Sequence, residues 1–230
     1  MIRFENVHKR YPNSREALGG VSFSIEAGEM VFLTGPSGAG KSTLLKLVAL
    51  IERPTRGTVL VNNRNTAKVG RRGIPRFRQR IGIVFQDHKL LHDRSVFDNV
   101  ALPLVIAGAT RRERERRVRA ALDQVGLLDR EAHSPLSLST GEQQRVGIAR
   151  AVAGRPDIVI ADEPTGNLDP ALSLEIMRLF ARFNEVGVTL LIASHDLELL
   201  SRLDYRRIEL VAGRLTHDAA QASRSGSAAP

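Results

Sequence analysis

Residues 35–43, GPSGAGKST, combine the residue types and the spacing of a loop that binds phosphate. They follow the apolar run MVFLT and open the helical pattern TLLKLVALI, so strand, loop and helix come in the order that G-x-x-x-x-G-K-[ST] requires. Glycines let backbone N–H groups converge on phosphate oxygens, and the start of a helix favours their charge. Lys41 is expected to reach the β- and γ-phosphates of a nucleotide, Ser42 to bind Mg²⁺ and Thr43 to support the α-phosphate. The nucleotide-binding residues predicted in this loop are Gly35, Pro36, Ser37, Gly38, Ala39, Gly40, Lys41, Ser42 and Thr43.

Two adjacent carboxylates, Asp162 and Glu163, follow the apolar run IVIA at residues 158–161. The carboxyl ends of parallel strands are where such a sheet presents ligand-binding residues. Asp162 is predicted to hold magnesium through its water shell. Glu163 is predicted to orient and polarise the attacking water, because phosphoryl transfer needs a positioned nucleophile and neutralised charge. An acidic strand end is weak evidence alone, and the phosphate loop earlier in the chain makes it strong.

A third pattern is LSTGEQQR at residues 138–145. Ser139 followed by Glu142 predicts a capped helix start, and the N–H groups of Gly141 and Glu142 are expected to be free. Free N–H groups at a helix start form an anion site, yet no phosphate-binding motif accompanies this helix. The pattern therefore predicts an anion site with no phosphate of its own nearby.

The elements that position these residues include two kinds of strand. Partly alternating segments predict an antiparallel sheet with one exposed face, and these are residues 2–7, 21–25 and 57–61. Continuous apolar runs followed by helical patterns predict buried parallel strands, and these are residues 30–34, 157–161 and 188–194. The sequence thus predicts an α/β fold.

Residues 95–154 contain no strand pattern and are predicted to form an inserted helical region. A Ser or Thr precedes an acid by three positions at Ser95, Thr110 and Ser139, which is a capping-box pattern at each place. The second helix is expected to end at Gly126 and to bury one apolar face, made of Val118, Ala121, Leu122 and Val125. The small and polar residues 217–230 are predicted to form a disordered tail.

Composition excludes several classes of protein. With 230 residues, 42% of them hydrophobic, the chain can bury one substantial core, and with no cysteine it has no disulfide framework or thiolate metal site. Its longest apolar run, VALPLVIAGA, is shorter than the roughly 20 residues of a spanning helix.

The net charge of +9 suits an anionic partner. Residues 64–80 hold seven Lys or Arg and no acid, and residues 111–119 hold six Arg against two Glu. Such runs are most often solvated surfaces, and contact of residues 64–80 with anionic lipid is a further hypothesis. Aromatic residues are 4% of the chain and Trp is absent, so nucleic acid is not an expected partner.

Together, GPSGAGKST, LSTGEQQR and IADEPTGNLD resemble the motifs of the ABC-type ATPases. The resemblance implies a P-loop NTPase (RecA-like) core with an antiparallel β subdomain and an inserted α-helical signature subdomain. One such domain is expected over residues 1–216, with its core in 1–90 and 157–216 and its helical part in 91–156. It implies hydrolysis of ATP to ADP and phosphate with Mg²⁺, by a homodimer that sandwiches two ATP molecules.

The resemblance assigns further roles residue by residue. Tyr11 would stack on adenine, Gln86 would sense magnesium and the γ-phosphate, and His195 would contact the γ-phosphate. The catalytic residues implied are Lys41, Gln86, Glu163 and His195, and the metal-binding ones are Ser42, Gln86 and Asp162. The signature residues that would act on the partner's ATP are Leu138, Ser139, Thr140, Gly141 and Glu142. The residues implied at the dimer contact are Asn167, Leu168 and Asp169.

Thr140 departs from the family pattern, which has glycine there. Threonine is β-branched and disfavours a left-handed backbone, so a position that needs positive φ would strain the closed dimer. A helical φ at 140 would cost little. We therefore expect an active but slow enzyme.

The segment after Gln86 resembles members of the family that act in bacterial cell division, as does FNEVGVTLLIASHD. The resemblance implies a cassette at the cytoplasmic face of the inner membrane, held by a four-span, permease-like subunit, that signals to peptidoglycan hydrolases. The predicted partner groove is formed by Asp87, His88, Lys89, Leu90 and Leu91. The alternatives are a subunit of a solute or lipoprotein transporter, an ATPase acting on DNA or ribosomes, and a scaffold that does not hydrolyse ATP.

Overall fold

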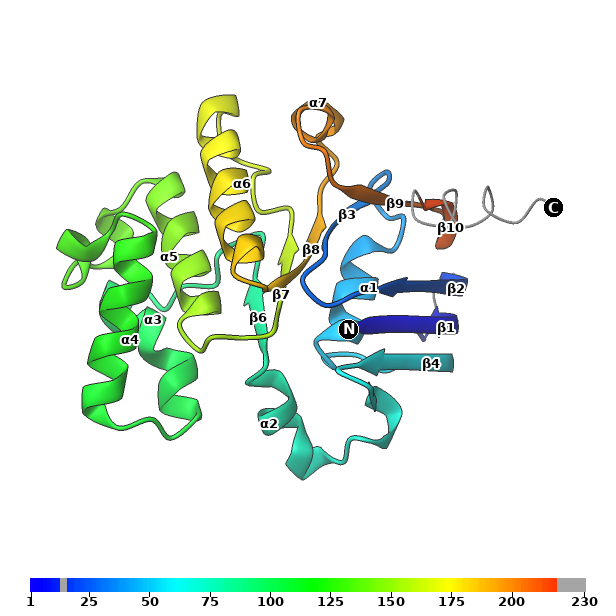
Figure 1. The fold of residues 1–230 in the computed structure, drawn as a ribbon, viewed down its shortest axis with the longest axis horizontal. Coiled ribbons are helices and arrows are strands. Elements are labelled where there is room, and N and C mark those ends of the chain that lie inside the picture. The colour runs from blue at the N-terminus through cyan, green and yellow to red at the C-terminus, as the bar shows by residue number, and fades with distance from the viewer. Residues whose placement is uncertain (13–15, 219–230) are drawn as a thin grey trace.

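The computed structural model describes residues 1–12 and 16–218, and within them the strands form two sheets (Figure 1). The smaller sheet has the order β2-β1-β4-β5 and is antiparallel. Its strands are β1 (Ile2–Arg10), β2 (Glu16–Ile25), β4 (Arg56–Val61) and β5 (Arg64–Asn65). Side chains along β1 alternate largely between buried and exposed, because this sheet has only one covered face.

The larger sheet has the order β10-β9-β3-β8-β7-β6 and is parallel except for β10. Its strands are β3 (Met30–Thr34), β6 (Ile81–Val84), β7 (Ile158–Asp162), β8 (Thr189–Ala193), β9 (Arg206–Val211) and β10 (Arg214–Asp218). Every residue of β3 and β8 is buried, since helices cover both faces of this sheet. The predicted combination of an α/β core with an antiparallel β subdomain is confirmed.

Helices pack around the larger sheet and form the inserted region. They are α1 (Lys41–Val48), α2 (Ile74–Arg78), α3 (Val96–Ile106), α4 (Arg111–Gln124), α5 (Thr140–Val152), α6 (Pro170–Glu185) and α7 (Leu197–Ser201). Short 3₁₀ turns lie at Thr66–Lys68, Arg71–Gly73, Leu128–Arg130 and Pro135–Ser137. Figure 1 shows α3, α4 and α5 together on one side of the molecule, with α6 between them and the larger sheet's centre.

The predicted helix starts are confirmed at Ser95, Thr110 and Ser139, whose side chains each accept a backbone N–H three residues on. The reciprocal bond of a capping box is present at α5, where the Glu142 carboxylate accepts the Ser139 backbone N–H. At Asp98 the carboxylate accepts from the Ser95 hydroxyl instead, at 2.8 Å. The predicted left-handed stop at Gly126 is present, with φ +68.

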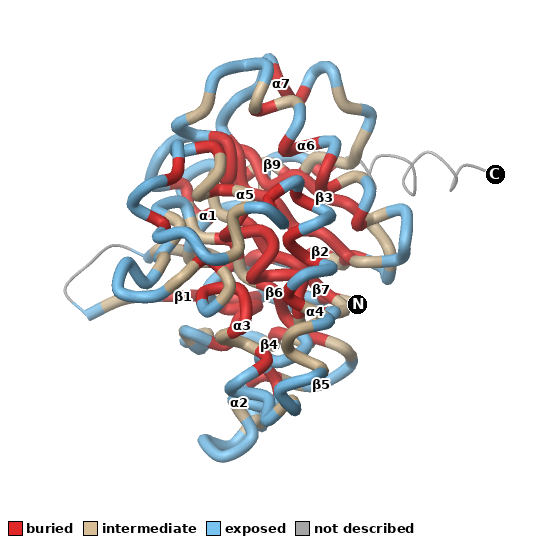
Figure 2. The backbone as a smooth tube through the Cα atoms, turned by 90° about the vertical axis from the view of Figure 1, so that its left-hand side faces the viewer, coloured by how far each residue is buried: buried red, intermediate tan, exposed pale blue. Residues whose placement is uncertain are grey.

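Two buried clusters hold the fold together, and the buried segments run through the middle of the molecule in Figure 2. One cluster joins the helical region to one face of the larger sheet, and it contains the predicted apolar face of α4. The other lies between α1, the antiparallel sheet and the larger sheet. Because β3, β7 and β8 are packed on both sides, their carboxyl ends form a rigid base for the loops that follow.

The predicted tail begins too early. His217 and Asp218 belong to β10, and the buried Asp218 pairs with Arg206 at 2.7 Å. Arg206 also pairs with Glu29 at 2.8 Å, so the end of β10 is fixed by a charged network. Residues 219–230 lie outside the described residues. No helix in residues 1–12 and 16–218 is long and apolar enough to cross a bilayer.

Candidate functional site

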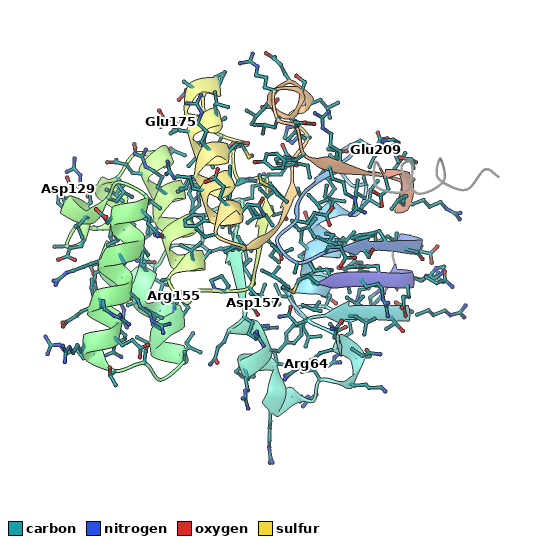
Figure 3. All side chains as sticks on the ribbon, viewed as in Figure 1. Arg64, Asp129, Arg155, Asp157, Glu175 and Glu209 are labelled. Atoms are coloured by element: carbon teal, nitrogen blue, oxygen red, sulfur yellow. The ribbon has the colours of Figure 1, made fainter. Side chains whose placement is uncertain are left out.

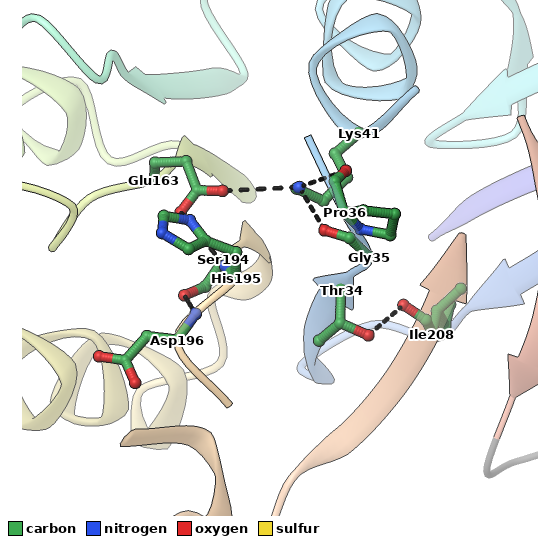
Figure 4. A network of polar contacts seen from close by, with 9 residues as sticks. All are labelled: Thr34, Gly35, Pro36, Lys41, Glu163, Ser194, His195, Asp196 and Ile208. Carbon is green, nitrogen blue, oxygen red and sulfur yellow. Dashed lines mark hydrogen bonds and ion pairs between the residues drawn. The ribbon is translucent and has the colours of Figure 1, made fainter. Parts of the chain in front are cut away.

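The loops that carry the predicted chemistry meet at one edge of the larger sheet. β3, β8 and β7 are neighbours, and Asp162 of β7 lies in register with Ala193 of β8. The loops beginning at residues 35, 163 and 194 therefore leave the sheet side by side, as the close-up in Figure 4 shows.

The loop at residues 35–40 depends on its glycines. Gly35 and Gly40 have φ of +134 and +106, and a Cβ at these positions would lie 2.0 Å from the Leu210 carbonyl oxygen and 2.6 Å from that of Ala17. A side chain would clash with backbone at both places, so the tight turn needs glycine. Helix α1 starts directly after Gly40 without a side-chain cap, which leaves its first N–H groups available to phosphate.

Lys41 lies over this loop and is only 7% exposed. Its ammonium donates hydrogen bonds to the carbonyl oxygens of Gly35 at 2.7 Å and Pro36 at 3.3 Å. The same nitrogen lies 3.7 Å from the carboxylate of Glu163. The structure thus brings together the predicted phosphate-binding lysine and the predicted catalytic acid.

Glu163 links Lys41 to His195 (Figure 4). Its Oε2 lies 2.8 Å from His195 Nδ1 and accepts the His195 backbone N–H at 3.3 Å. Glu163 has a φ of +48, which few non-glycine residues adopt, and its side chain is 12% exposed. A carboxylate held between an ammonium and an imidazole can orient a water molecule and accept its proton.

Asp162 has the environment of a metal-binding carboxylate. Burial raises its pKa, while the Ser42 hydroxyl acts against this by hydrogen bonding to the charged form. Its Oδ1 is buried without a hydrogen-bond partner among the described residues. An unpaired carboxylate oxygen beside a hydroxyl suits a hard cation, so these residues fit Mg²⁺.

The rest of such a metal shell would come from phosphate and water. The part of the chain that the structure describes holds no group of three or more His, Cys, Asp and Glu that could bind a metal alone. Mg²⁺ characteristically uses one or two protein ligands together with substrate phosphates. Gln86 and Asp162 line the same cavity of about 320 Å³, together with Phe85, Asp87 and Asn167.

Tyr11 lies just beyond β1, and its ring centre is 4.8 Å from the ammonium of Lys9. Lys9 pairs in turn with Glu52 at 2.7 Å. The contact with Lys9 holds the ring by a cation–π interaction. Stacking of this ring on adenine stays a prediction, and residues 13–15 beside it lie outside the described residues.

The signature helix α5 differs from the prediction in one respect. Glu142 N–H is not free, because it donates to Ser139 Oγ at 3.3 Å, while the Ser139 N–H donates to Glu142 Oε2 at 2.8 Å. Hydrogen bonding to Ser139 lowers the pKa of Glu142. The N–H groups of Thr140 and Gly141 make no hydrogen bond within the described residues, so these two donors are available to an anion.

Gly141 and Thr140 have different surroundings. A Cβ at Gly141 would lie 2.3 Å from the Leu172 side chain of α6, so glycine lets the two helices approach closely. Thr140 is exposed, is the first residue of α5, and is absent from the residues with positive φ. The backbone at 140 therefore does not call for glycine.

The residues predicted at the dimer contact lead into α6. Asp169 caps this helix by accepting the Leu172 N–H at 3.0 Å, with Pro170 at its first turn as expected. Leu168 packs on the core, and Asn167 lines the cavity beside Gln86. Within the described residues no hydrogen bond or ion pair joins residues 138–142 to residues 35–43. One chain alone does not unite the two anion sites.

The predicted partner-facing residues 87–91 lie in the connection from β6 to α3, which spans residues 85–95. Asp87 and Lys89 pair on the surface at 2.5 Å, Leu91 is 40% exposed, and Leu90 packs against the core. Sequence reasoning missed the residue that holds this connection, Arg150 of α5, which donates to the carbonyl oxygens of His88 and Lys89. An arginine inside the apolar run VGIARAVA was the available signal.

Residues 18–166 match the family model described as ABC transporter. The chain belongs to the ABC transporter family. This cassette is 57% identical over 215 residues to the cell division ATP-binding protein FtsE of Escherichia coli K12, covering 94% of the chain and 97% of that protein. It is 44% identical to the protein of the same name from Bacillus subtilis 168, covering 95% and 96%.

Solved structures agree with this assignment. The cassette superposes with a TM-score of 0.87 on a dimeric, post-hydrolysis state of the ATP-binding cassette MJ0796 bound to ADP and phosphate, at 35% identity over 95% of the chain and 97% of the other. The predicted ABC ATPase fold is therefore confirmed, and the cassette is an ATP hydrolase.

Proposed function

We propose that this cassette is the ATPase of a bacterial cell-division complex of the FtsE–FtsX type. ATP would close a dimer of the cassette, and the closure would signal through a membrane partner to regulate septal peptidoglycan hydrolysis. The observation that carries the proposal is the 57% identity to E. coli FtsE, which extends over 94% of the chain and 97% of that protein. A likeness of that extent includes the segments around residues 87–91 as well as the catalytic motifs.

The chemistry follows from the arrangement at the sheet edge. The N–H groups of the loop at 35–40 and the Lys41 ammonium bind the phosphates, which displaces the ammonium from the Gly35 and Pro36 carbonyls. Mg²⁺, held by Ser42 and Asp162, would neutralise charge on the transferred phosphoryl group. Glu163 would orient the attacking water and His195 would contact the γ-phosphate.

Dimer closure would complete the site. The free N–H groups of Thr140 and Gly141 would bind the γ-phosphate held by the other protomer, so ATP favours the closed state by contacting both halves. Hydrolysis removes the shared phosphate and lets the halves part. The relative MJ0796 is dimeric in its solved structure, which supports this arrangement here.

The partner is proposed to be FtsX, a four-span membrane protein that would hold the cassette at the cytoplasmic face of the inner membrane. Residues 87–91 would form one side of the contact. A groove of about 580 Å³ lies between α2, the end of α3 and residues 151–157. Figure 3 labels two of its lining residues, Arg155 and Asp157. The lining of the groove includes Arg80, Arg117 and Arg155 together with Asp157, and apolar side chains such as Ile106, which is 65% exposed. This lining suits a partner segment that is acidic and apolar.

Capture from membranes tests the partner. A Glu163→Gln variant, which should hold ATP in a closed dimer, is recovered from gently solubilised membranes with and without ATP, and mass spectrometry identifies what accompanies it. FtsX should be recovered. Recovery of a different permease would make the cassette a transporter subunit, and recovery of no membrane protein would contradict the proposal.

A matched pair of variants locates the contact. Leu91→Asp and Leu128→Asp, made in the Glu163→Gln background, each replace a leucine that is 40% exposed. Leu91→Asp should abolish capture while Leu128→Asp should keep it. Leu90 and His88 are left intact, because Leu90 packs on the core and the His88 carbonyl binds Arg150. Equal capture by both variants would place the contact elsewhere.

The basic segment 64–80 is proposed to touch anionic lipid beside the partner. Five of its cations are exposed and form neither an ion pair nor a side-chain hydrogen bond among the described residues, namely Arg64, Lys68, Arg71, Arg72 and Arg76. Figure 3 shows Arg64 on the part of the molecule that carries α2, which also lines the groove. A cation close to an anionic surface contributes about 1 kcal/mol.

Flotation with phosphatidylglycerol vesicles tests this contact. Arg71→Glu with Arg72→Glu should abolish flotation, whereas Arg112→Glu with Arg116→Glu should not, because these exposed α4 residues lie outside the segment. The two pairs change the net charge equally. Equal flotation of both double variants would exclude a specific lipid-binding segment, and salt-dependent binding of the parent to RNA but not to vesicles would favour nucleic acid.

A further inference from the structure

The connection between β6 and α3 is held by a buried arginine from another helix. Arg150 of α5 is 9% exposed, and its Nη1 donates to the Lys89 carbonyl oxygen at 2.7 Å. Its Nη2 donates to the His88 carbonyl oxygen. Arg150 has no ion pair with a carboxylate among residues 1–12 and 16–218, so backbone carbonyl dipoles are what its charge faces. A planar guanidinium can bind two adjacent acceptors at once, which a lysine cannot do in the same way.

The backbone bound by Arg150 has an unusual conformation. His88 and Lys89 have φ of +54 and +49, in the left-handed region that non-glycine residues rarely adopt. This conformation turns two successive carbonyls toward one guanidinium. Two consecutive left-handed residues need an external contact to persist, and Arg150 supplies it.

A second buried side chain holds the other end of the connection. Asn99 of α3 is fully buried, accepts the Leu91 N–H at 2.7 Å and donates to the Leu91 carbonyl at 2.9 Å. The connection is therefore fixed to α3 at Leu91 and to α5 at residues 88 and 89. The first part of the connection, at Phe85, Gln86 and Asp87, lines the cavity that contains Asp162.

This geometry joins two parts of the ATPase. Gln86 lies two residues before the carbonyls that Arg150 binds, and α5 begins at the signature residue Thr140. A helix transmits displacement along its axis with little deformation, and α5 spans the interval from Thr140 to Arg150. A movement of the Gln86 segment would thus be carried to the signature.

We propose that Arg150 is a positioning residue for ATP hydrolysis. Arg150 ties the segment that carries Gln86 to the signature helix, so that the two move as one body when the site closes. The proposal concerns the hydrolysis cycle of the cassette itself and does not depend on the identity of the membrane partner.

Steady-state ATP hydrolysis by the purified full chain tests the role. Arg150→Met should lower kcat at least about fivefold and leave KM for ATP within about twofold, because the nucleotide still binds the loop at 35–43. Arg150→Lys, which can bind one carbonyl, should fall between the parent and Arg150→Met. An unchanged kcat in Arg150→Met would overturn the proposal.

Glycine substitutions at residues 88 and 89 distinguish two roles of Arg150, which are positioning of the loop and packing of α5. His88→Gly with Lys89→Gly should restore most of the kcat lost in Arg150→Met, since glycine adopts positive φ without the contact. A loss of packing in α5 would not be repaired by glycines in the loop. Failure of the glycine pair to raise kcat would therefore also overturn the proposal. If Arg150→Met does not fold, the same comparison is made with Arg150→Lys.

Arg78 provides a matched control. Its guanidinium also binds two successive backbone carbonyls, those of Ala49 at 3.2 Å and Leu50 at 3.0 Å, and Leu50 too has a positive φ of +52. This contact lies at the end of α1 and involves none of residues 85–91. Arg78→Met should lower the melting temperature while kcat stays within about twofold of the parent. An equal drop of kcat in Arg78→Met and Arg150→Met would show a general loss of stability and contradict the proposal.

Discussion

The starts of α1 and α5 are both predicted to bind phosphate, and the structure builds them in opposite ways. α1 begins at Gly40 without a side-chain cap, and Lys41 and Glu163 lie beside it. α5 begins at Ser139 with a complete capping box, which occupies the N–H of Glu142. An uncapped helix start with a cation nearby can bind phosphate within one chain, whereas a capped start has fewer donors left. The difference predicts that α1 would supply most of the phosphate binding and that α5 would add the last contacts when two chains close.

Among the substitutions that test this comparison, the one that removes the charge of Glu163 should have the largest effect on ATP hydrolysis. Glu163→Gln should lower ATP hydrolysis by roughly 10² to 10³, because an amide cannot accept the proton of the attacking water. ATP binding should persist, since the loop and Lys41 are unchanged. Phosphate release gives the rate and equilibrium dialysis gives the affinity. Retention of more than about a tenth of the rate would show that another group acts as the base.

A side chain added between α5 and α6 should have the next largest effect, on the free energy of unfolding and on hydrolysis. Gly141→Ala puts a Cβ against Leu172 and should reduce the free energy of unfolding by about 1–3 kcal/mol, and hydrolysis with it. Gly147→Ala in the same helix meets no atom within 4 Å and should stabilise the protein by about 0.5–1 kcal/mol. Chemical denaturation measures both.

Shortening the Leu172 side chain tests whether it causes the loss of stability in Gly141→Ala. Leu172→Ala combined with Gly141→Ala should recover part of the stability that Gly141→Ala loses, because the overlap is with the Leu172 side chain. If the two substitutions are simply additive, the close approach of Gly141 to Leu172 is not what requires glycine.

Asp162 should lower the stability of the nucleotide-free protein at neutral pH. Burial raises the pKa of Asp162 above the ordinary value of an aspartate, so the folded state binds the proton more tightly than the unfolded state does. Its contribution is therefore most favourable below the unfolded pKa and is lost as pH rises through the folded pKa. Asp162→Asn should raise the free energy of unfolding at pH 7, measured without nucleotide and magnesium, and the gain should shrink as the pH falls through the folded pKa of Asp162.

The control for this effect is Asp129→Asn, because Asp129 is exposed in the helical region and should change stability by less than about 0.5 kcal/mol. ATP hydrolysis should be lost in the Asp162→Asn variant and retained in the Asp129→Asn variant. A destabilised Asp162→Asn protein at pH 7 would show that the carboxylate has a favourable partner in the folded state.

Sequence patterns predicted the parts of the site that depend on local spacing. The loop around Lys41, the carboxylates at the end of β7 and the cap at Ser139 each follow from residues within a few positions of one another. The fold followed from the two kinds of strand and the helical insertion. Contacts between distant segments did not follow, because no local pattern indicates that Arg150 reaches the carbonyls of residues 88 and 89.

The tail boundary and the free N–H of Glu142 were wrong for related reasons. Asp218 belongs to β10, where it lies opposite Ile208 and forms an ion pair with Arg206, which the composition of the last residues does not show. The predicted capping box itself consumes the Glu142 N–H, so that group could not also serve an anion. Both errors arose because a segment was interpreted without the side chain that it contacts.

Thr140 should have the smallest effect, although the family pattern has glycine at its position. Thr140 is exposed, is the first residue of α5 and has no positive φ, so its β-branch meets no conformational penalty there. Thr140→Gly and Thr140→Ala should therefore both leave the rate of ATP hydrolysis within about twofold of the parent. Glycine should cost a few tenths of a kcal/mol of stability relative to alanine.

If the closed dimer instead needs positive φ at 140, glycine alone would speed hydrolysis and alanine would not, since only glycine adopts that conformation freely. A difference of more than about threefold between the two variants would therefore show that α5 changes its first turn on closing, and that its capped start is not the form that meets the phosphate.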